Sequence, residues 1–255
     1  MPPITFMLVF MNVPTADDSD LAHRIGHAES YPFARPACSY LFEDGGMRPL
    51  PKDAAAGRIP IVASGSNAAP ARLAAKFGTA HDVPVTRAEL RHFTVVFAGH
   101  FTGYGAIPAT LFPCRGAVTQ VWITWLTPDQ LQIMHGSEGV ISCREAEQRY
   151  DFFELVDIDL RPDCLAPISR AGAYLSRRML APDGEPIRFA EAAATGSRLR
   201  ARSHRATLRH AASLLEPGKP FGDFMSRVLS GVGERQTLFE ELTPYTILRE
   251  TGFPS

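Results

Sequence analysis

The sequence has little cysteine and almost no net charge. Its 255 residues include four cysteines, and none of them forms a CxxC pair or a metal-finger spacing. We therefore expect reduced thiols, as in a cytoplasmic protein, and no metal site. A formal net charge of -1 argues against a dedicated nucleic-acid or membrane-surface binder, which needs a strong electrostatic footprint.

A long apolar run is also absent. The segment "ITFMLVFMNV", residues 4–13, is about half as long as a membrane span, and no cationic segment precedes it. We expect a buried strand or an ordered arm there, and no membrane contact. The basic stretch "RLRARSHRATLRHAA" near the C-terminus is interpreted as a solvated helix face, so no nucleic-acid partner is expected.

Strands and helices are mixed without regular alternation, which favours the α+β class over a doubly wound parallel sheet. Apolar segments predict buried strands at residues 59–63, 94–100, 117–126 and 150–160. Capping residues and early prolines predict helices at about 18–28, from about 69 to a cap at Gly78, and from a Thr127 cap to about 136. Turn residues predict a hairpin over 39–50 and two short strands around Asp183-Gly184.

These elements divide the chain into three expected parts. Residues 1–57 form an N-terminal arm and hairpin that pack on the core, and residues 58–175 form that core. Residues 176–255 add a hairpin and a mostly helical C-terminal extension.

The segment "SGSN", residues 64–67, stands where the strand 59–63 meets the following helix. The first N–H groups of a helix have no partner within it, so this junction can stabilise an anion. Gly65 allows close approach to the backbone, and Ser66 and Asn67 can contact a ligand or cap the helix. The same residues also suit an ordinary capped turn, and they match neither a Walker loop nor GxGxxG.

Two further segments carry polar groups that could reach the same cleft. "HGSEGV", residues 135–140, places Glu138 just beyond a predicted helix, where it faces either a cleft or solvent. "GHFTGYG" carries His100 and Tyr104 directly after an apolar strand. A structural role for His100 stays open beside a role in the cleft.

Taken in order, "SGSN" with its helix, "GAIPATLFP", "VWITWL", "SEGV" and a strand opening with Tyr150 resemble the γ-glutamylcyclotransferase-like family over residues 58–175. The resemblance implies a small mixed β-barrel flanked by helices, here with a mostly helical C-terminal extension. It implies a transferase or lyase that cleaves a γ-glutamyl or related amide by intramolecular aminolysis, with no metal or organic cofactor.

Site residues follow from the resemblance and from the cleft argument. Glu138 falls on the family's catalytic acid/base, and Ser64 replaces an aromatic residue that the family usually carries. The expected substrate-binding residues are Ser64, Gly65, Ser66, Asn67, His100, Tyr104 and Tyr150.

Two alternatives remain open from the sequence. The same fold could serve as a non-catalytic domain that binds a small molecule or a protein, or water could replace the internal amine in a small-amide hydrolase. The expected partner of the enzyme is a small-molecule amide substrate.

Overall fold

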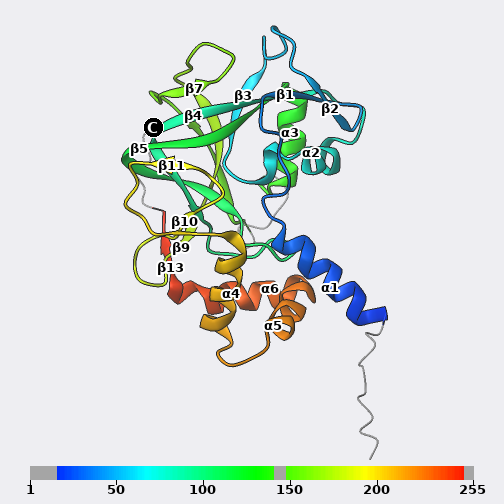
Figure 1. Cartoon of the computed structure of the whole chain (residues 1–255), viewed down its shortest axis with the longest axis vertical. Coiled ribbons are helices and arrows are strands. Elements are labelled where there is room, and N and C mark those ends of the chain that lie inside the picture. The colour runs from blue at the N-terminus through cyan, green and yellow to red at the C-terminus, as the bar shows by residue number, and fades with distance from the viewer. Residues whose placement is uncertain (1–15, 141–147, 250–255) are drawn as a thin grey trace, which may run out of the picture.

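Two long antiparallel strands, β4 (Val83–Phe97) and β5 (Ala109–Leu126), form the centre of the fold. The computed structural model describes residues 16–140 and 148–249 (Figure 1). Apolar side chains dominate the facing segments of both strands, and most of them are buried. The predicted strands 94–100 and 117–126 are therefore parts of longer strands, the first of which ends at Phe97.

The sheet has eleven strands, and its main path runs β12-β10-β4-β5-β3-β8-β6. Most pairs are antiparallel, while β3 with β8 and β10 with β12 are parallel. The other strands of this path are β3 (Ile59–Ala63), β6 (Tyr150–Leu155), β8 (Ala171–Ser176), β10 (Arg188–Phe189) and β12 (Ala201–Arg202). Four strands branch from it: β1 (Tyr40–Glu43), β2 (Gly46–Pro49), β7 (Leu160–Pro162) and β11 (Ala194–Thr195).

The mixed sheet and its helices confirm the α+β class. Within residues 16–140 and 148–249, however, the path ends at β6 and β12, and these two strands do not pair with each other. The closed barrel that the resemblance implied is therefore not confirmed.

The helices form two groups (Figure 1). One group packs near α1 (Ala16–Glu29) and contains α4 (His204–Leu215), α5 (Phe221–Leu229) and α6 (Val232–Leu242). The other contains α2 (Pro70–Phe77) and α3 (Pro128–Ser137), which contact each other. None of the helices in the described ranges has the length and apolarity that crossing a bilayer requires.

Local sequence signals account for the ends of α2 and α3. Thr127 accepts a hydrogen bond from the Gln130 N–H and completes a capping box, with Pro128 at the first helical position. Gly78 ends α2 with a φ of 67°, in the region that glycine adopts easily. On α2, Leu73 and Phe77 are buried four residues apart, so the neighbouring face carries Arg72 and Lys76.

Two predictions of strands in the second half of the chain were wrong in detail. The strand expected over 150–160 stops at Leu155, because Asp157 adopts a left-handed φ of 53° and the chain turns. The chain becomes extended again at β7. This strand pairs with β4, whereas β6 pairs with β8.

The turn at Asp183-Gly184 is present, with Gly184 at a φ of 81°. Its flanking strands nevertheless do not form a hairpin ladder. A single bond joins them, from the Ile187 N–H to the Leu180 carbonyl. Instead β9 (Arg178–Leu180) pairs with β13 (Thr246–Leu248), and β10 pairs with β4 and β12. The apolar segment 4–13 lies outside the described residues.

Candidate active site

A cavity of about 440 Å³ opens where β3 and β5 meet α2 and the loop that follows β4. It is large enough for a small metabolite. The eight residues predicted to form the site all line it: Ser64, Gly65, Ser66, Asn67, His100, Tyr104, Glu138 and Tyr150. Folding therefore brings them together, while their roles in binding or catalysis stay predictions.

Glu138 is held in place through one of its two carboxylate oxygens. Its Oε1 accepts hydrogen bonds from the Lys76 ammonium and from the Asn67 amide, the latter at 3.1 Å. The Oε2 atom accepts no hydrogen bond from any residue in the described ranges. Both side chains of the ion pair are largely buried, with 6% of Lys76 and 16% of Glu138 exposed.

Lys76 is fully engaged by its neighbours. Besides Glu138, its Nζ donates to the Asn67 Oδ1 at 2.8 Å and contacts the Met134 Sδ at 3.2 Å. These contacts use its three donors and fix Asn67 and Glu138 against each other. The acid is thus oriented by α2 and by the loop after β3, although it follows α3 in the chain.

The loop between β3 and α2 contains a short 3₁₀ turn, η1 (Ser66–Ala68). The Tyr40 hydroxyl donates to the Ala68 carbonyl at 2.8 Å, and this contact fixes the end of the turn. The first N–H groups of such a turn have no partner within it, and both Ser66 and Asn67 line the cavity.

Glycine is needed at position 65 for a reason that the sequence did not show. A Cβ atom there would lie 2.0 Å from the hydroxyl oxygen of Tyr31. Gly65 therefore allows Tyr31 of the same chain, and not only a ligand, to approach the backbone closely. Any larger residue would displace Tyr31 or the loop.

Two buried tyrosines hold the start of β5. The Tyr31 hydroxyl accepts from the Ala109 N–H at 2.8 Å, and the Tyr150 hydroxyl donates to the Ala109 carbonyl at 3.3 Å. Burial raises the pKa of both hydroxyls above the ordinary value for tyrosine. Both phenols therefore stay protonated at neutral pH.

His100 is a neutral imidazole near neutral pH. Burial, assisted by the positive charge of Arg149, lowers its pKa to about 3. Its ring packs edge-on against Tyr150, with centroids 5.2 Å apart. This environment supports a neutral wall residue and argues against His100 as the acid/base.

Tyr104 lines the cavity as a neutral hydroxyl. It is hydrogen bonded to Ser66, and burial raises its pKa. Ser64, where the family usually has an aromatic residue, is 8% exposed and lines the cavity between β3 and Gly65.

The C-terminal helices pack against parts of the cavity wall. Arg149 donates to the Gln236 Oε1 at 2.5 Å and stacks on the ring of Phe239, both in α6. Gly105, at a φ of 87°, leaves space for Leu229 and Met225 of α5 beside the loop that carries Tyr104.

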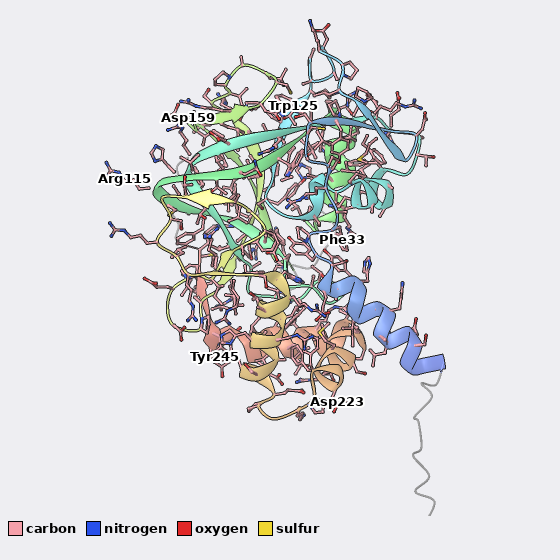
Figure 2. The ribbon with its side chains drawn as sticks, in the orientation of Figure 1. Phe33, Arg115, Trp125, Asp159, Asp223 and Tyr245 are labelled. Carbon is pink, nitrogen blue, oxygen red and sulfur yellow. The ribbon has the colours of Figure 1, made fainter. Side chains whose placement is uncertain are left out.

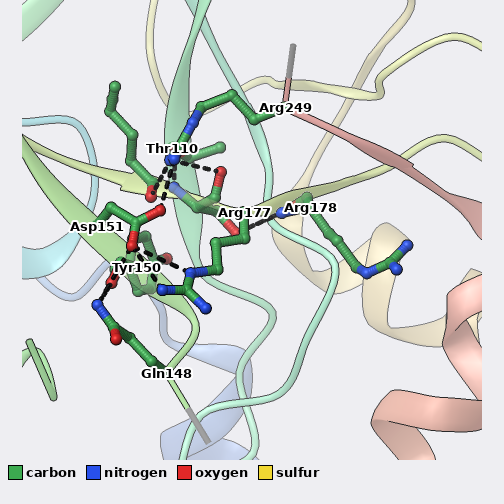
Figure 3. A network of polar contacts seen from close by, with 9 residues as sticks. Thr110, Gln148, Tyr150, Asp151, Arg177, Arg178 and Arg249 are labelled. Atoms are coloured by element: carbon green, nitrogen blue, oxygen red, sulfur yellow. Dashed lines mark hydrogen bonds and ion pairs between the residues drawn. The ribbon is translucent and has the colours of Figure 1, made fainter. Parts of the chain in front are cut away.

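An ionic network lies directly beside Tyr150 (Figure 3). The Asp151 carboxylate accepts from Arg177 at 2.8 Å and from Arg249 at 2.5 Å. Arg249 also donates to the Leu175 carbonyl at 2.8 Å, so this residue, which follows β13, joins β6 to β8. The network thereby fixes the strand on which Tyr150 stands.

The wall residues that the sequence analysis missed include Tyr31, Arg72, Lys76, Arg149 and Tyr174. For Arg72 and Lys76 a signal exists, because two cations four residues apart occupy one helix face directly after the "SGSN" loop. For Tyr31 we find no signal, since its contact with Gly65 spans distant segments. In the described ranges, no three His, Cys, Asp or Glu side chains are placed to hold a metal ion.

No protein-family model matches the chain, and no curated protein matches it. Solved structures do match. One named γ-glutamyl cyclotransferase has 15% identity, covers 67% of this chain and 85% of its own, and gives a TM-score of 0.39. A human protein described as uncharacterized has 16% identity, the same two coverages and a TM-score of 0.37.

A third match is a yeast γ-glutamyl cyclotransferase specific to glutathione, with 12% identity, coverage of 73% of this chain and 96% of its own, and a TM-score of 0.31. The chain is similar to γ-glutamyl cyclotransferase structures, the family that its motifs resemble.

Proposed function

We propose that the protein is an enzyme of the γ-glutamylcyclotransferase type, which cleaves a γ-glutamyl or related amide by intramolecular aminolysis. The observation that carries this proposal is the way in which the Glu138 carboxylate is held. One of its oxygens is fixed by Lys76 and Asn67, the other accepts no hydrogen bond from residues 16–140 or 148–249, and Glu138 lines a cavity of about 440 Å³. A carboxylate held in this way is oriented and can still exchange a proton.

The reaction needs a proton carrier and no protein nucleophile. The substrate's own α-amine attacks its γ-carbonyl carbon, so a ring C–N bond forms and the amide C–N bond breaks. Two protons leave the attacking ammonium, and both end on the departing amine, which leaves as an ammonium ion. Glu138 Oε2 would carry them from one nitrogen to the other.

The surrounding groups suit the other needs of this reaction. The backbone amides of Ser66 and Asn67 would donate to the oxyanion that forms on the γ-carbonyl. Lys76 acts as a positioning residue, because it touches Glu138 and has no donor left for a substrate. Because the nucleophile belongs to the substrate, no cofactor enters the scheme.

The proposal also includes the cellular compartment of the protein and its binding partner. Cys38, Cys114 and Cys164 are free thiols, which suits a reducing compartment, and we propose the cytoplasm. The proposed partner is a small-molecule amide.

The products of the reaction test the proposal. Incubated with a panel of γ-glutamyl amides, the protein is expected to release 5-oxoproline and the free amine in equal amounts. Mass spectrometry separates 5-oxoproline from glutamate, the product that hydrolysis by water would give. Glutamate as the first product, or no turnover of any member of the panel, would contradict intramolecular aminolysis.

A further inference from the structure

A second cavity, of about 680 Å³, lies where the chain enters β1 and leaves β7, and it shares no lining residue with the candidate active site. Two free thiols, Cys38 and Cys164, line it, and both residues are exposed to solvent. Figure 2 shows Asp159, one residue before β7, at the opposite end of the molecule from Asp223 of α5. The function proposed above uses neither cysteine.

The sheet brings the two cysteines together from opposite directions. β5 occupies one edge of β4, and β1 and β7 pair in turn along the other, β1 with Val83–Val85 and β7 with Ala88–Leu90. Both strands run antiparallel to β4, so the chain before β1 and the chain after β7 converge beside Arg87. Cys38 stands in the first of these segments and Cys164 in the second.

Direct hydrogen bonds join the residues next to the two thiols. The Ser39 Oγ donates to the Asp163 Oδ1 at 2.6 Å and accepts from the Arg87 N–H at 3.0 Å. The Asp163 N–H in turn donates to the Arg87 carbonyl at 2.9 Å. The Cys164 thiol also hydrogen bonds to Ser39, the residue that follows Cys38. Such contacts bring the chain neighbours of the bonded residues close to the Cα separation of about 4.4–6.8 Å that a disulfide needs.

The Cys164 thiol has a base beside it. It is hydrogen bonded to the Asp163 carboxylate, and partial burial together with this carboxylate raises the pKa of the thiol. Cys164 therefore stays protonated at neutral pH, and Asp163 can accept its proton when it reacts. We expect Cys38 to react first with an oxidant in the cavity and Cys164 to react second.

We propose that Cys38 and Cys164 are a redox modification site, at which a low-molecular-weight disulfide oxidises the two thiols to an intramolecular disulfide. In the first step the Cys38 thiolate attacks one sulfur of the oxidant, and one small thiolate leaves. In the second step Cys164 passes its proton to Asp163 and attacks the Cys38 sulfur, and the second small thiolate leaves. The two protons of the cysteines end on the two departing thiols, so the oxidant is reduced as the protein is oxidised.

The disulfide would act on the candidate active site through Tyr40. This residue, two positions after Cys38, donates its hydroxyl to the Ala68 carbonyl at 2.8 Å, at the end of η1. Because Cys164 must leave Ser39 to reach Cys38, the segment before β1 shifts and the contact of Tyr40 weakens. The resulting effect on turnover rests on the proposed function, whereas the disulfide itself does not.

Peptide mapping tests the disulfide. The native protein is incubated with 2-hydroxyethyl disulfide, which carries no γ-glutamyl group, the remaining thiols are alkylated, and the protein is digested without reductant. Mass spectrometry should then find the peptides of Cys38 and Cys164 joined in most molecules, and dithiothreitol should separate them. One hydroxyethyl group on each cysteine, or a bond between two copies of the chain, would overturn the proposal.

Cys114→Ser is the matched control, because Cys114 lines neither cavity, and it should leave the cross-link unchanged. Cys38→Ser should prevent the cross-link. In protein unfolded by urea the pairing should become mixed, since four cysteines allow three sets of two disulfides. An equal preference for Cys38 with Cys164 in the unfolded chain would mean that the fold does not position the pair.

Oxidation is expected to lower kcat/KM for 5-oxoproline release by about 2- to 10-fold, the effect of losing one hydrogen bond, and dithiothreitol should restore it. Cys38→Ser and Cys164→Ser, treated in the same way, should show no loss. Complete cross-linking with unchanged kcat/KM would contradict the effect on the loop.

The disulfide can be tested even if the protein turns over no γ-glutamyl amide. In that case the proposed function falls, while the peptide map still decides whether Cys38 and Cys164 pair. The emission of Trp122, whose ring centre lies 6.5 Å from that of Tyr40, then reports on the loop. It should change on oxidation of the wild-type protein and not of Cys38→Ser, and an unchanged emission would contradict the shift of Tyr40.

Discussion

Replacing Glu138 by glutamine is expected to lower kcat for 5-oxoproline release by about 10²- to 10⁴-fold, the usual contribution of general acid/base catalysis. The amide oxygen of glutamine can still accept from Lys76 and Asn67, so the side chain keeps its place. Its NH₂ group replaces Oε2 and cannot take a proton from the attacking amine. Steady-state kinetics with one γ-glutamyl amide measures the effect, and KM should change little.

Stability must be separated from catalysis in this variant, because the Lys76 ammonium loses its counter-charge. The assay is therefore run well below the melting temperature of the variant. Glu154→Gln serves as the control, since Glu154 is 57% exposed and pairs with Arg170. A Glu138→Gln protein that remains folded and turns over at near wild-type rate would remove Glu138 as the proton carrier.

Replacing Lys76 by methionine is expected to lower the free energy of unfolding by about 3–5 kcal/mol, the cost of leaving one member of a buried ion pair without its partner. The pair is sheltered from water, with 6% and 16% of the two side chains exposed. The same change frees the carboxylate from its main anchor and should lower kcat as well. Urea denaturation monitored by fluorescence measures the stability.

The double variant Lys76→Met, Glu138→Gln shows whether the loss comes from the unpaired charge. It should be less destabilised than the sum of the two single variants, by about 0.5–3 kcal/mol, because neither charge is then left alone. Arg170→Met, which breaks an exposed pair, should leave the free energy of unfolding almost unchanged. Additive losses in the Lys76 and Glu138 variants would mean that the two side chains are not energetically coupled.

The sequence predicted the elements that local signals define. The strand 59–63, the cap at Thr127 and the turn at Gly78 depend on residues that are near neighbours in the chain, and the structure has them. The break at Asp157 was missed because one residue with positive φ leaves no mark on hydrophobic periodicity. The partners of β9 and β10 were missed because they come from distant strands.

The candidate site also has features that the sequence predicted and features that it could not predict. The "SGSN" loop and Glu138 could be found from short motifs and from the family resemblance. The contact that holds Glu138 could not, because Lys76 and Glu138 are 62 residues apart and meet only after α2 packs on α3. The reason for Gly65 was likewise hidden, since Tyr31 reaches it from the segment after α1.

A crystal structure with 5-oxoproline bound tests the central claim most directly. The ring N–H of the product should lie within hydrogen-bond distance of the Glu138 Oε2, and its oxo group should face the amides of Ser66 and Asn67. A product bound elsewhere, or a Glu138 whose two oxygens both turn to Lys76 and away from the ligand, would contradict the account.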